Sequence, residues 1–285
     1  MPSTRRVAAA LRRVPVHLTL LLICAVWTVP VLGLFVSSFR PAYDITTTGW
    51  WRVPSTLGHL NIGNYLQVLQ AGGFGTALFN SLLIATPAVV VMVGFGAPAA
   101  FALARFDFPG RRVLLVLVLV LIAVPVQVTL VPVLRLYNFT GLTGTFVGIW
   151  LVHLGFGLPF AIYLLRTFFA SLPDELFEAA ALDGASTLGS FLRVAVPVSA
   201  PALASVAIFQ FVWVWNDLLI ALIFLGGDPG VAPLTVAVSN LVSASTGQGW
   251  QLLTAAAFVA MVVPMVVFFA LQRYFVRGLL AGSGK

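Results

Sequence analysis

Charged side chains and cysteine are both scarce in this sequence. Only 8% of its 285 residues are Asp, Glu, Lys or Arg, whereas 60% are hydrophobic. A soluble domain typically carries about 25% charged residues, so this composition predicts a chain embedded in lipid. Cys24 is the only cysteine, which excludes an internal disulfide and a cysteine-based metal cluster.

The common sequence motifs of enzymes and nucleotide-binding proteins are also missing. His17, His59 and His153 stand apart from one another, and the chain has neither a His-Glu-x-x-His zinc motif nor a Gly-x-Ser-x-Gly nucleophile motif. Gly-Ser-Gly-Lys at residues 282–285 is not a phosphate-binding loop, because Leu279 replaces its first glycine and no Ser or Thr follows. We therefore expect no enzymatic activity, no metal and no cofactor on this chain.

Six apolar runs are long enough to cross a bilayer, which requires about 20 residues each. The predicted spans cover residues 14–36, 76–104, 113–134, 146–165, 194–225 and 251–274. The chain is thus predicted to be an all-α membrane protein, with an N-terminal tail at 1–13 and a single transmembrane domain at 14–285. A short helix is expected at 64–69 in the polar segment after the first span, and a polar loop is expected at 226–249.

The first apolar run has a competing interpretation as a cleaved signal peptide. The apolar part of a signal peptide is only about 7–15 residues long. The run at 14–36 is longer, so we favour a retained first span.

Positive charges divide unequally between the two sides of the predicted spans. Six spans place both termini on one side, and twelve of the fifteen Lys and Arg residues fall on that side. Only Arg40, Arg52 and Arg135 fall on the other. Because positive residues accumulate on the cytoplasmic side, both termini are predicted to be cytoplasmic. The net charge of +7 is accordingly interpreted as membrane orientation and not as a nucleic-acid site.

Half of the eight acidic residues lie in one short stretch, residues 171–197. They are Asp174, Glu175, Glu178 and Asp183. The pattern predicts two helices around a break at Gly184, which can adopt the left-handed conformation that ends helices. Ser171 is expected to cap the first helix, and a hydroxyl at 186–187 to cap the second. Three alanines at 179–181 leave a smooth surface that another protein could approach.

This stretch resembles the cytoplasmic EAA loop of permease subunits in ATP-binding-cassette importers. The resemblance rests on Glu-Ala-Ala at 178–180, on Gly184 and on Val-Pro at 196–197, between the fourth and fifth predicted spans. Further motifs are similar to those of maltose-type carbohydrate permeases, and the last is typical of the second, shorter permease. They are Phe-Ala-Leu-Ala-Arg-Phe at 101–106 with Phe-Pro-Gly-Arg at 108–111, Trp-Asn-Asp at 215–217, and Gln-Arg-Tyr-Phe-Val-Arg-Gly-Leu at 272–279.

The resemblance implies a type I importer fold and a set of partners. A second permease subunit would complete the pathway, two ATPase subunits would hold ATP and Mg²⁺, and an extracytoplasmic binding protein would deliver a sugar. The loop at 171–193 would dock on an ATPase subunit as a coupling helix. The expected coupling residues are Glu178, Ala179, Ala180, Leu182, Asp183 and Gly184. The chain would be a bacterial inner-membrane protein surrounded by lipid, with no nucleic-acid partner.

Polar side chains within the spans are candidates for the solute pathway, because they are costly in lipid and usually face inward. Gln210, Trp213 and Asp217 are three or four residues apart, so they share one helix face. Amides and carboxylates can hydrogen-bond sugar hydroxyls, and an indole can stack on a sugar ring. The full candidate set is Gln210, Trp213, Asn216, Asp217 and Gln127. Hydrogen bonding to neighbouring helices is the alternative for these residues, and we favour it for His153.

Three other functions stay open from the sequence. A related permease could carry another solute, such as glycerol phosphate or an oligosaccharide derivative. A stand-alone secondary carrier should have coupling-ion sites with paired intramembrane charges, and only Asp217 resembles one. A membrane enzyme such as a lipid-linked glycosyltransferase should have acids or histidines clustered at a membrane face, and the only acidic cluster is the alanine-containing stretch.

Overall fold

The computed structural model describes residues 4–70, 73–241 and 249–283, with side chains described within 14–273 of these ranges. Every regular element of the described residues is a helix, which confirms the predicted all-α class. Residues 1–3 of the predicted tail, residues 242–248 of the predicted outer loop and Lys285 lie outside the described residues. The chain divides into two compact units, residues 1–71 with 238–259 and residues 72–237 with 260–285.

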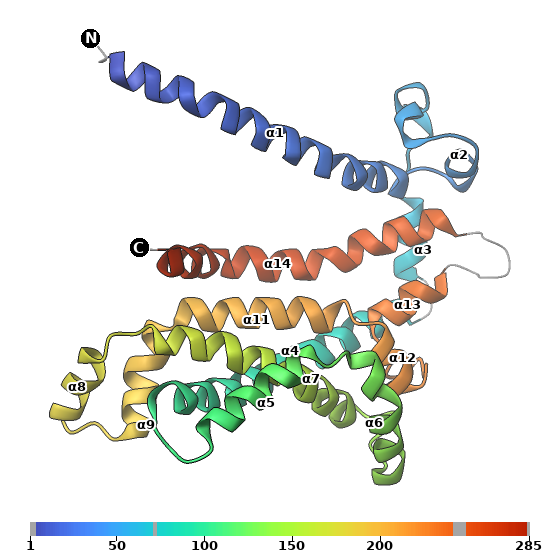
Figure 1. The fold of residues 1–285 in the computed structure, drawn as a ribbon. Helices are drawn as coiled ribbons and strands as arrows, with labels where there is room; N and C mark the ends of the chain where they lie inside the picture. The colour runs from blue at the N-terminus through green and yellow to red at the C-terminus, as the bar shows by residue number, and fades with distance from the viewer. Residues whose placement is uncertain (1–3, 71–72, 242–248, 284–285) are drawn as a thin grey trace. The chain divides into compact units, whose positions relative to one another are not determined.

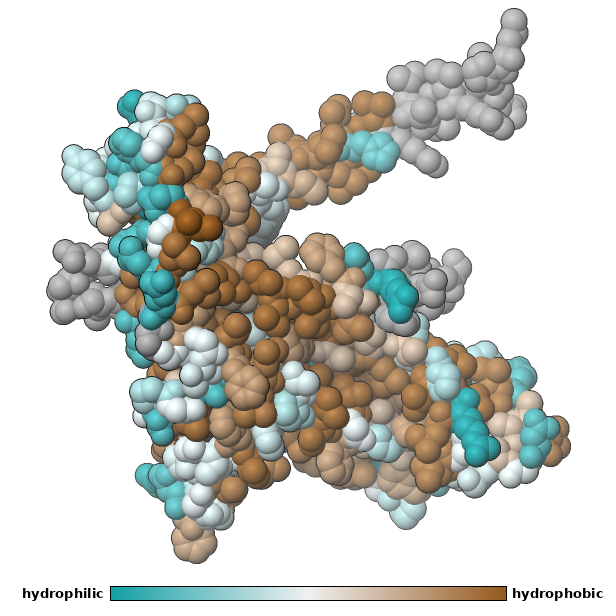
Figure 2. All heavy atoms as spheres, turned by 180° about the vertical axis from the view of Figure 1, so that it is seen from behind, coloured by the Kyte–Doolittle hydropathy of each residue, from teal (hydrophilic) through white to brown (hydrophobic). Residues whose placement is uncertain are grey.

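The first unit consists mainly of one long apolar helix and a set of short helices. The long helix is α1 (Thr4–Ser38), and its segment Val14–Ser38 is apolar enough to span a membrane. Figure 2 shows hydrophobic side chains along this segment. The short helices are α2 (Ala42–Thr47), η1 (Trp50–Ser55), η2 (Leu57–His59) and α3 (Gly63–Gln70). The helix expected at 64–69 is therefore confirmed as α3.

Arg40 stabilises the turn that follows α1. Its side chain is fully buried, and it donates hydrogen bonds to the carbonyl oxygens of Asp44 (2.7 Å) and Thr48 (3.2 Å). The Asn64 amide donates to the carbonyl oxygens of Ser38 and Arg40, both at 2.9 Å. Because buried polar groups are costly unless they are bonded, these contacts fix the path of the chain between α1 and α3.

Three helices form the core of the second unit (Figure 1). α4 (Phe74–Arg105) packs most extensively on α7 (Phe146–Ala170), and α11 (Ala200–Trp215) packs on both. Small buried side chains, including those of Ala97 and Ala161, belong to the core that these helices share. Small residues allow helix backbones to approach closely, which stabilises helix pairs in lipid.

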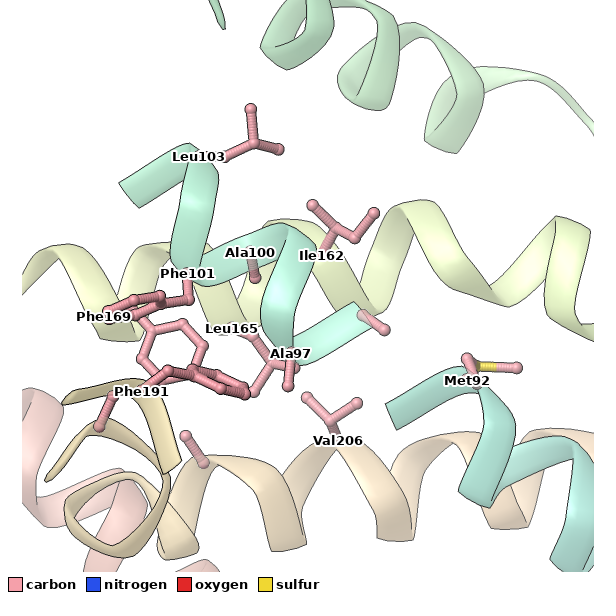
Figure 3. Close-up of a cluster of buried hydrophobic side chains, with 13 residues drawn as sticks. Met92, Ala97, Ala100, Phe101, Leu103, Ile162, Leu165, Phe169, Phe191 and Val206 are labelled. Carbon is pink, nitrogen blue, oxygen red and sulfur yellow. The ribbon is translucent and has the colours of Figure 1, made fainter. Parts of the chain in front are cut away.

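Phenylalanine rings fill one end of this core. Phe101 of α4 lies 5.7 Å from Phe169 of α7 and 5.1 Å from Phe191, measured between ring centroids. Figure 3 shows the three rings close together, and Phe101 and Phe169 lie near the C-terminal ends of α4 and α7. Edge-to-face and tilted ring pairs at such distances add to the packing energy. The end of α4 is thereby fixed to the segment that follows α7.

Two of the predicted spans are bent helix pairs. α5 (Arg111–Ala123) and α6 (Val126–Thr140) meet at 101°, and the helical stretch Thr187–Val198 meets α11 at 75°. Pro125 precedes α6 and Pro201 lies in the first turn of α11, and a proline lacks the N–H that would continue a helix. Among the described residues four helices can span a membrane alone, and the predicted six spans are reached when each bent pair counts as one.

The other helices are shorter, apart from the last. They are α8 (Glu175–Leu182), α9 (Thr187–Ser190), the π-helical η3 (Phe191–Ala195), α10 (Val196–Val198), α12 (Leu219–Leu225), α13 (Leu234–Leu241) and α14 (Trp250–Ser283).

α13 lies where the sequence predicted a loop. Leu234 is buried there, its N–H donates to the Ser81 hydroxyl (2.7 Å), and the Asn80 amide donates to the carbonyl oxygen of Gly230 (3.0 Å). Part of the predicted outer loop is therefore anchored on α4.

Candidate functional site

The acidic stretch folds as a helical hairpin, α8 followed by α9. Gly184 ends α8 with a φ of +76°. The N–H of Gly184 donates to the carbonyl oxygen of Ala181 (3.0 Å), and that of Ala185 donates to Ala180 (2.9 Å). This pair of bonds is a Schellman motif, which needs the left-handed residue that glycine supplies. The predicted break at Gly184 is confirmed, and so is the predicted cap by Ser186, whose hydroxyl accepts from the Gly189 N–H (3.2 Å).

The prediction that Ser171 caps α8 is wrong. α7 extends to Ala170, so Ser171 is its C-terminal cap, and the serine hydroxyl donates to the carbonyl oxygen of Phe168 (2.7 Å). Asp174 occupies the N-cap position of α8 but makes no capping bond. Its carboxylate accepts a hydrogen bond from Arg105 at the end of α4 instead. A tertiary ion pair thus replaces the local cap.

Arg105 and Phe177 attach α8 to the core. The Arg105 guanidinium also donates to the carbonyl oxygen of Leu172 and lies 4.3 Å above the centre of the Phe177 ring. Phe177 in turn lies 5.8 Å from Phe101, so it joins the phenylalanine end of the core. A largely buried guanidinium over an aromatic face contributes a cation–π attraction. One face of α8 is therefore held against the end of α4.

The rest of α8 faces outward. Leu182 is 89% exposed. Glu178, Ala179, Asp183 and Gly184 are exposed as well, and Ala180 is half-buried. In Figure 1 the hairpin projects from one end of the second unit. All six predicted coupling residues thus lie on one short hairpin whose inner face alone is fixed.

Two of the predicted pathway residues lie together at a cleft. The cleft has a volume of about 350 Å³ and opens at the bend between α5 and α6, against α7 and α11. Gln210 and Trp213 line it, with Val126, Phe156 and Phe160 among the apolar residues around them. The arrangement pairs one amide and one indole with an apolar wall, which suits a small solute that has both polar and apolar faces.

Gln210 is buried and tied to the neighbouring helix. Its Nε2 donates to the carbonyl oxygen of Gly157 on α7 (2.9 Å). A β-carbon at Gly157 would lie 2.4 Å from the Met92 Cε atom and 3.0 Å from the Gln210 Oε1 atom. The absent β-carbon of Gly157 thus leaves room for the Met92 and Gln210 side chains against α7, and this close packing holds the Gln210 amide at the cleft.

Asp217 stabilises the break between α11 and α12. Its carboxylate accepts from the backbone N–H groups of Ile220 (3.2 Å) and Ala221 (2.9 Å) at the start of α12. The Nε2 atom of buried His153 lies 3.7 Å from the same carboxylate, too far for a hydrogen bond, and has no other partner among the described residues. The His153 ring packs edge-on against Trp213 at 5.4 Å. Asp217 thus caps a helix behind the cleft.

The structure does not bring the remaining pathway candidates to the cleft. Asn216 is exposed, and its amide donates to the carbonyl oxygen of Val212 (2.8 Å). Gln127 is exposed on α6 and is not among the described residues that line the cleft. The sequence had placed Gln210, Trp213 and Asp217 on one continuous helix face. α11 ends at Trp215, so Asp217 belongs to a separate turn.

The sequence predicts neither the Arg105–Phe177 contact nor the bend that forms the cleft. The 101° angle between α5 and α6 lies within a run that the sequence predicts as a single span. Arg105 and Phe177 are far apart in sequence, and a phenylalanine near a helix start carries no indication of its tertiary partner. Only the fold brings these two residues together.

The described residues thus combine helices that can span a membrane, a projecting hairpin and a cleft at a helix bend. Residues 92–280 match the family described as "Binding-protein-dependent transport system inner membrane component". The chain belongs to this family. It is therefore a permease component of a binding-protein-dependent system, located in the inner membrane.

Similar proteins are found across nearly the whole chain. "Osmoprotective compounds uptake permease protein GgtD" of Synechocystis is 53% identical over 286 aligned residues, which cover 99% of this chain and 96% of that protein. "Alpha-glucoside transport system permease protein AglG" of Rhizobium meliloti is 50% identical over 81% of this chain and 62% of that protein. A chain of a solved bacterial transporter for import of the acidic polysaccharide alginate has the same fold, with a TM-score of 0.71 at 21% identity over 96% of this chain and 99% of that chain.

Proposed function

We propose that this chain forms half of the translocation pathway of an ATP-driven carbohydrate importer. A second permease subunit supplies the other half, two ATPase subunits bind ATP and Mg²⁺, and an extracytoplasmic binding protein delivers the solute. The nucleotide sites are thereby assigned to the ATPase subunits and not to this chain. Both termini and the α8–α9 hairpin face the cytoplasm, as the excess of arginine on that side supports.

The observation that carries this proposal is the two-faced attachment of α8. Its inner face is fixed to the core through Phe177 and Arg105, whereas Leu182 on the hairpin is 89% exposed. A surface loop without a partner needs neither the fixed inner face nor an exposed leucine. A helix that transmits force needs both, because a docking surface must be joined rigidly to the elements that it moves.

The contacts of α8 give a route for this movement. ATP-driven closure of the ATPase pair displaces the two docked hairpins of the permeases. In this chain the Phe177 ring packs against Phe101 at the end of α4, and Phe101 packs against Phe191 in η3, which precedes α11. α4 and α11 are packed helices that shift as rigid bodies, so displacement of α8 changes access to the space between them and α7.

The solute passes along the cleft that Gln210 and Trp213 line. The Gln210 amide keeps hydrogen-bonding capacity at its Oε1 atom while its Nε2 atom is bound to Gly157. The half-buried Trp213 offers an indole face for stacking on a sugar ring. Asn216, Asp217 and Gln127 stay candidates for later steps of the pathway, with Asp217 acting through the turn that it caps.

Carbohydrate is the proposed solute class because AglG, 50% identical, is named for alpha-glucoside transport. An osmoprotective solute is the second candidate, because GgtD is 53% identical over nearly all of both chains. Both classes can be polyhydroxylated, which suits the amide and indole at the cleft. Competition between an alpha-glucoside and an osmoprotective solute for uptake separates the two candidates.

Gly184→Val tests the coupling role of the hairpin. The φ of +76° at Gly184 costs an L-residue about 1–2 kcal/mol, and most for a β-branched one. We expect the variant to insert normally and the reconstituted importer to hydrolyse ATP while uptake per ATP falls. Gly58→Val is the matched control, because Gly58 has no positive φ and no neighbour within 4 Å of an added β-carbon.

Two results would contradict the proposal. If Gly184→Val takes up as much solute per ATP as the wild type, the hairpin does not couple ATP hydrolysis to uptake. Uptake by proteoliposomes that contain this chain without any ATPase subunit would remove the importer assignment altogether.

A further inference from the structure

A basic pocket lies at the turn between α4 and α5, outside both the hairpin contacts and the cleft. Its volume is about 480 Å³, and its lining includes Asp107, Gly110, Arg111, Arg112 and Arg166. Three guanidinium groups face one carboxylate, so the pocket carries a positive excess. No part of the proposed transport mechanism uses it.

The charges of the pocket are only partly balanced within the chain. Arg111 is engaged, because it pairs with the Asp107 carboxylate and its Nε donates to the carbonyl oxygen of Leu103 (3.0 Å). The Nε of Arg166 is buried and has no hydrogen-bond partner among the described residues. Arg112 is exposed and has no ion pair with a described residue. Arg112 and Arg166 therefore supply the unbalanced positive charge.

The start of α5 adds to the positive character of the pocket. Gly110 occupies the N-cap with a φ of +87° and offers no side chain to cap the first turn. The first N–H groups of a helix and its dipole favour an anion. This contribution supports the arginines, which define the site.

An apolar groove continues from this pocket between α5 and α7. It has a volume of about 140 Å³ and is lined by Leu115, Val118, Leu119, Ile162, Tyr163 and Arg166. The groove shares Leu115 and Arg166 with the basic pocket. Both helices belong to candidate membrane spans, so the groove runs into the part of the chain that lipid surrounds.

We propose that the pocket and groove together bind one anionic phospholipid. The phosphate of the headgroup lies among Arg111, Arg112 and Arg166, and an acyl chain lies in the groove. Arginine pairs well with phosphate because its guanidinium can donate two parallel hydrogen bonds. A soluble anion would leave the groove empty, whereas a lipid uses both parts. The site requires only that the chain spans a membrane, and it does not depend on the solute.

Lipid retention by the purified full chain tests this site. The chain is placed in nanodiscs of equal parts phosphatidylglycerol and phosphatidylethanolamine, extracted, and its retained lipids are measured by native mass spectrometry. We expect phosphatidylglycerol to be retained in preference. The double variant Arg112→Ala/Arg166→Ala should lower that preference about thirtyfold, which corresponds to about 1 kcal/mol for each arginine removed. Arg135→Ala, which removes an exposed arginine elsewhere in the unit, should not change it.

A second variant separates a lipid from a free anion. Leu119→Trp fills the groove from an exposed position and leaves the arginines in place. We expect it to reduce phosphatidylglycerol retention, and we expect inorganic phosphate to displace little of the lipid from the wild type. Unchanged retention in the double variant would overturn the proposal. Displacement of the lipid by inorganic phosphate, with no effect of Leu119→Trp, would overturn it as well. So would a double variant that loses a co-purifying protein subunit but keeps its lipid.

Discussion

Gln210 shows how a single buried amide can serve both packing and a pathway. Its Nε2 atom bonds the carbonyl oxygen of Gly157 at 2.9 Å, and the same side chain lines the cleft. The missing β-carbon of Gly157 leaves room for this contact. The sequence thus predicted Gln210 as a pathway residue, but it did not identify Gly157, which leaves room for the Gln210 side chain.

Replacing this amide tests the cleft. Gln210→Met keeps the length of the side chain and removes the hydrogen bond, which should lower the free energy of unfolding by about 1 kcal/mol. If the solute contacts the amide, the KM for uptake should rise several-fold while ATP hydrolysis without solute is unchanged. Thermal unfolding in detergent measures the change in stability, and uptake kinetics in proteoliposomes measure the change in KM.

Gln251→Met is the control for this substitution. Gln251 is a half-buried glutamine at the start of α14 and lies outside the cleft lining. Equal KM values for Gln210→Met and the wild type would contradict a solute contact, whatever the effect on stability.

Residue patterns predicted local features well where the cause was local. The left-handed Gly184 and the Ser186 cap follow from chain chemistry within four residues, and both are observed. The prediction that Ser171 caps α8 is wrong because α7 continues to Ala170, and the Ser171 hydroxyl bonds at the end of α7 instead. A cap depends on where the previous helix stops, which local sequence does not specify.

At the scale of elements, α8 owes its position to side chains that are far apart in sequence. Arg105 at the end of α4 contacts Asp174, the carbonyl oxygen of Leu172 and the Phe177 ring. The Asp174 carboxylate is exposed, so the ion pair contributes little. The cation–π contact and the backbone hydrogen bond therefore carry most of the attachment.

Arg105→Ala should loosen α8 without unfolding the chain. Loss of these contacts should weaken the attachment by about 1–2 kcal/mol. Amide hydrogen exchange at residues 172–182 should accelerate, and uptake per ATP should fall. Arg193→Ala, at an exposed arginine of η3, should change neither quantity. If hydrogen exchange at residues 172–182 in Arg105→Ala stays as slow as in the wild type while uptake per ATP falls, the Arg105 contacts do not hold α8.

The bent helices mark the limit of prediction from periodicity. Apolar runs predicted six spans, but the run at 113–134 lies in a helix pair that meets at 101°. The run at 194–225 contains a 75° bend before α11 and a second break before α12. Hydropathy reports burial in lipid and not direction, and a proline permits a bend without setting its angle. The cleft lies at the first of these bends, so the sequence could name its residues but not assemble them.

At the scale of the whole molecule, the distribution of arginine makes a prediction about orientation. The hairpin and the α12–α13 connection should lie on opposite sides of the membrane. In a Cys24→Ser background, Asp228→Cys should react with an impermeant maleimide in intact cells. Leu182→Cys, at a position that is 89% exposed, should react only after the membrane is opened. Labelling of both cysteines in intact cells would show that the predicted orientation of the hairpin is wrong or that the chain does not cross the membrane six times.

The same two cysteines test the central claim, that α8 docks on a separate ATPase. The chain is reconstituted with its ATPase subunits, companion permease and binding protein, and ATP-driven uptake is verified before a short thiol–amine cross-linker is added. We predict that Leu182→Cys cross-links to the ATPase subunit and that Asp228→Cys does not. No cross-link from Leu182→Cys in a preparation that is active in uptake would contradict the account.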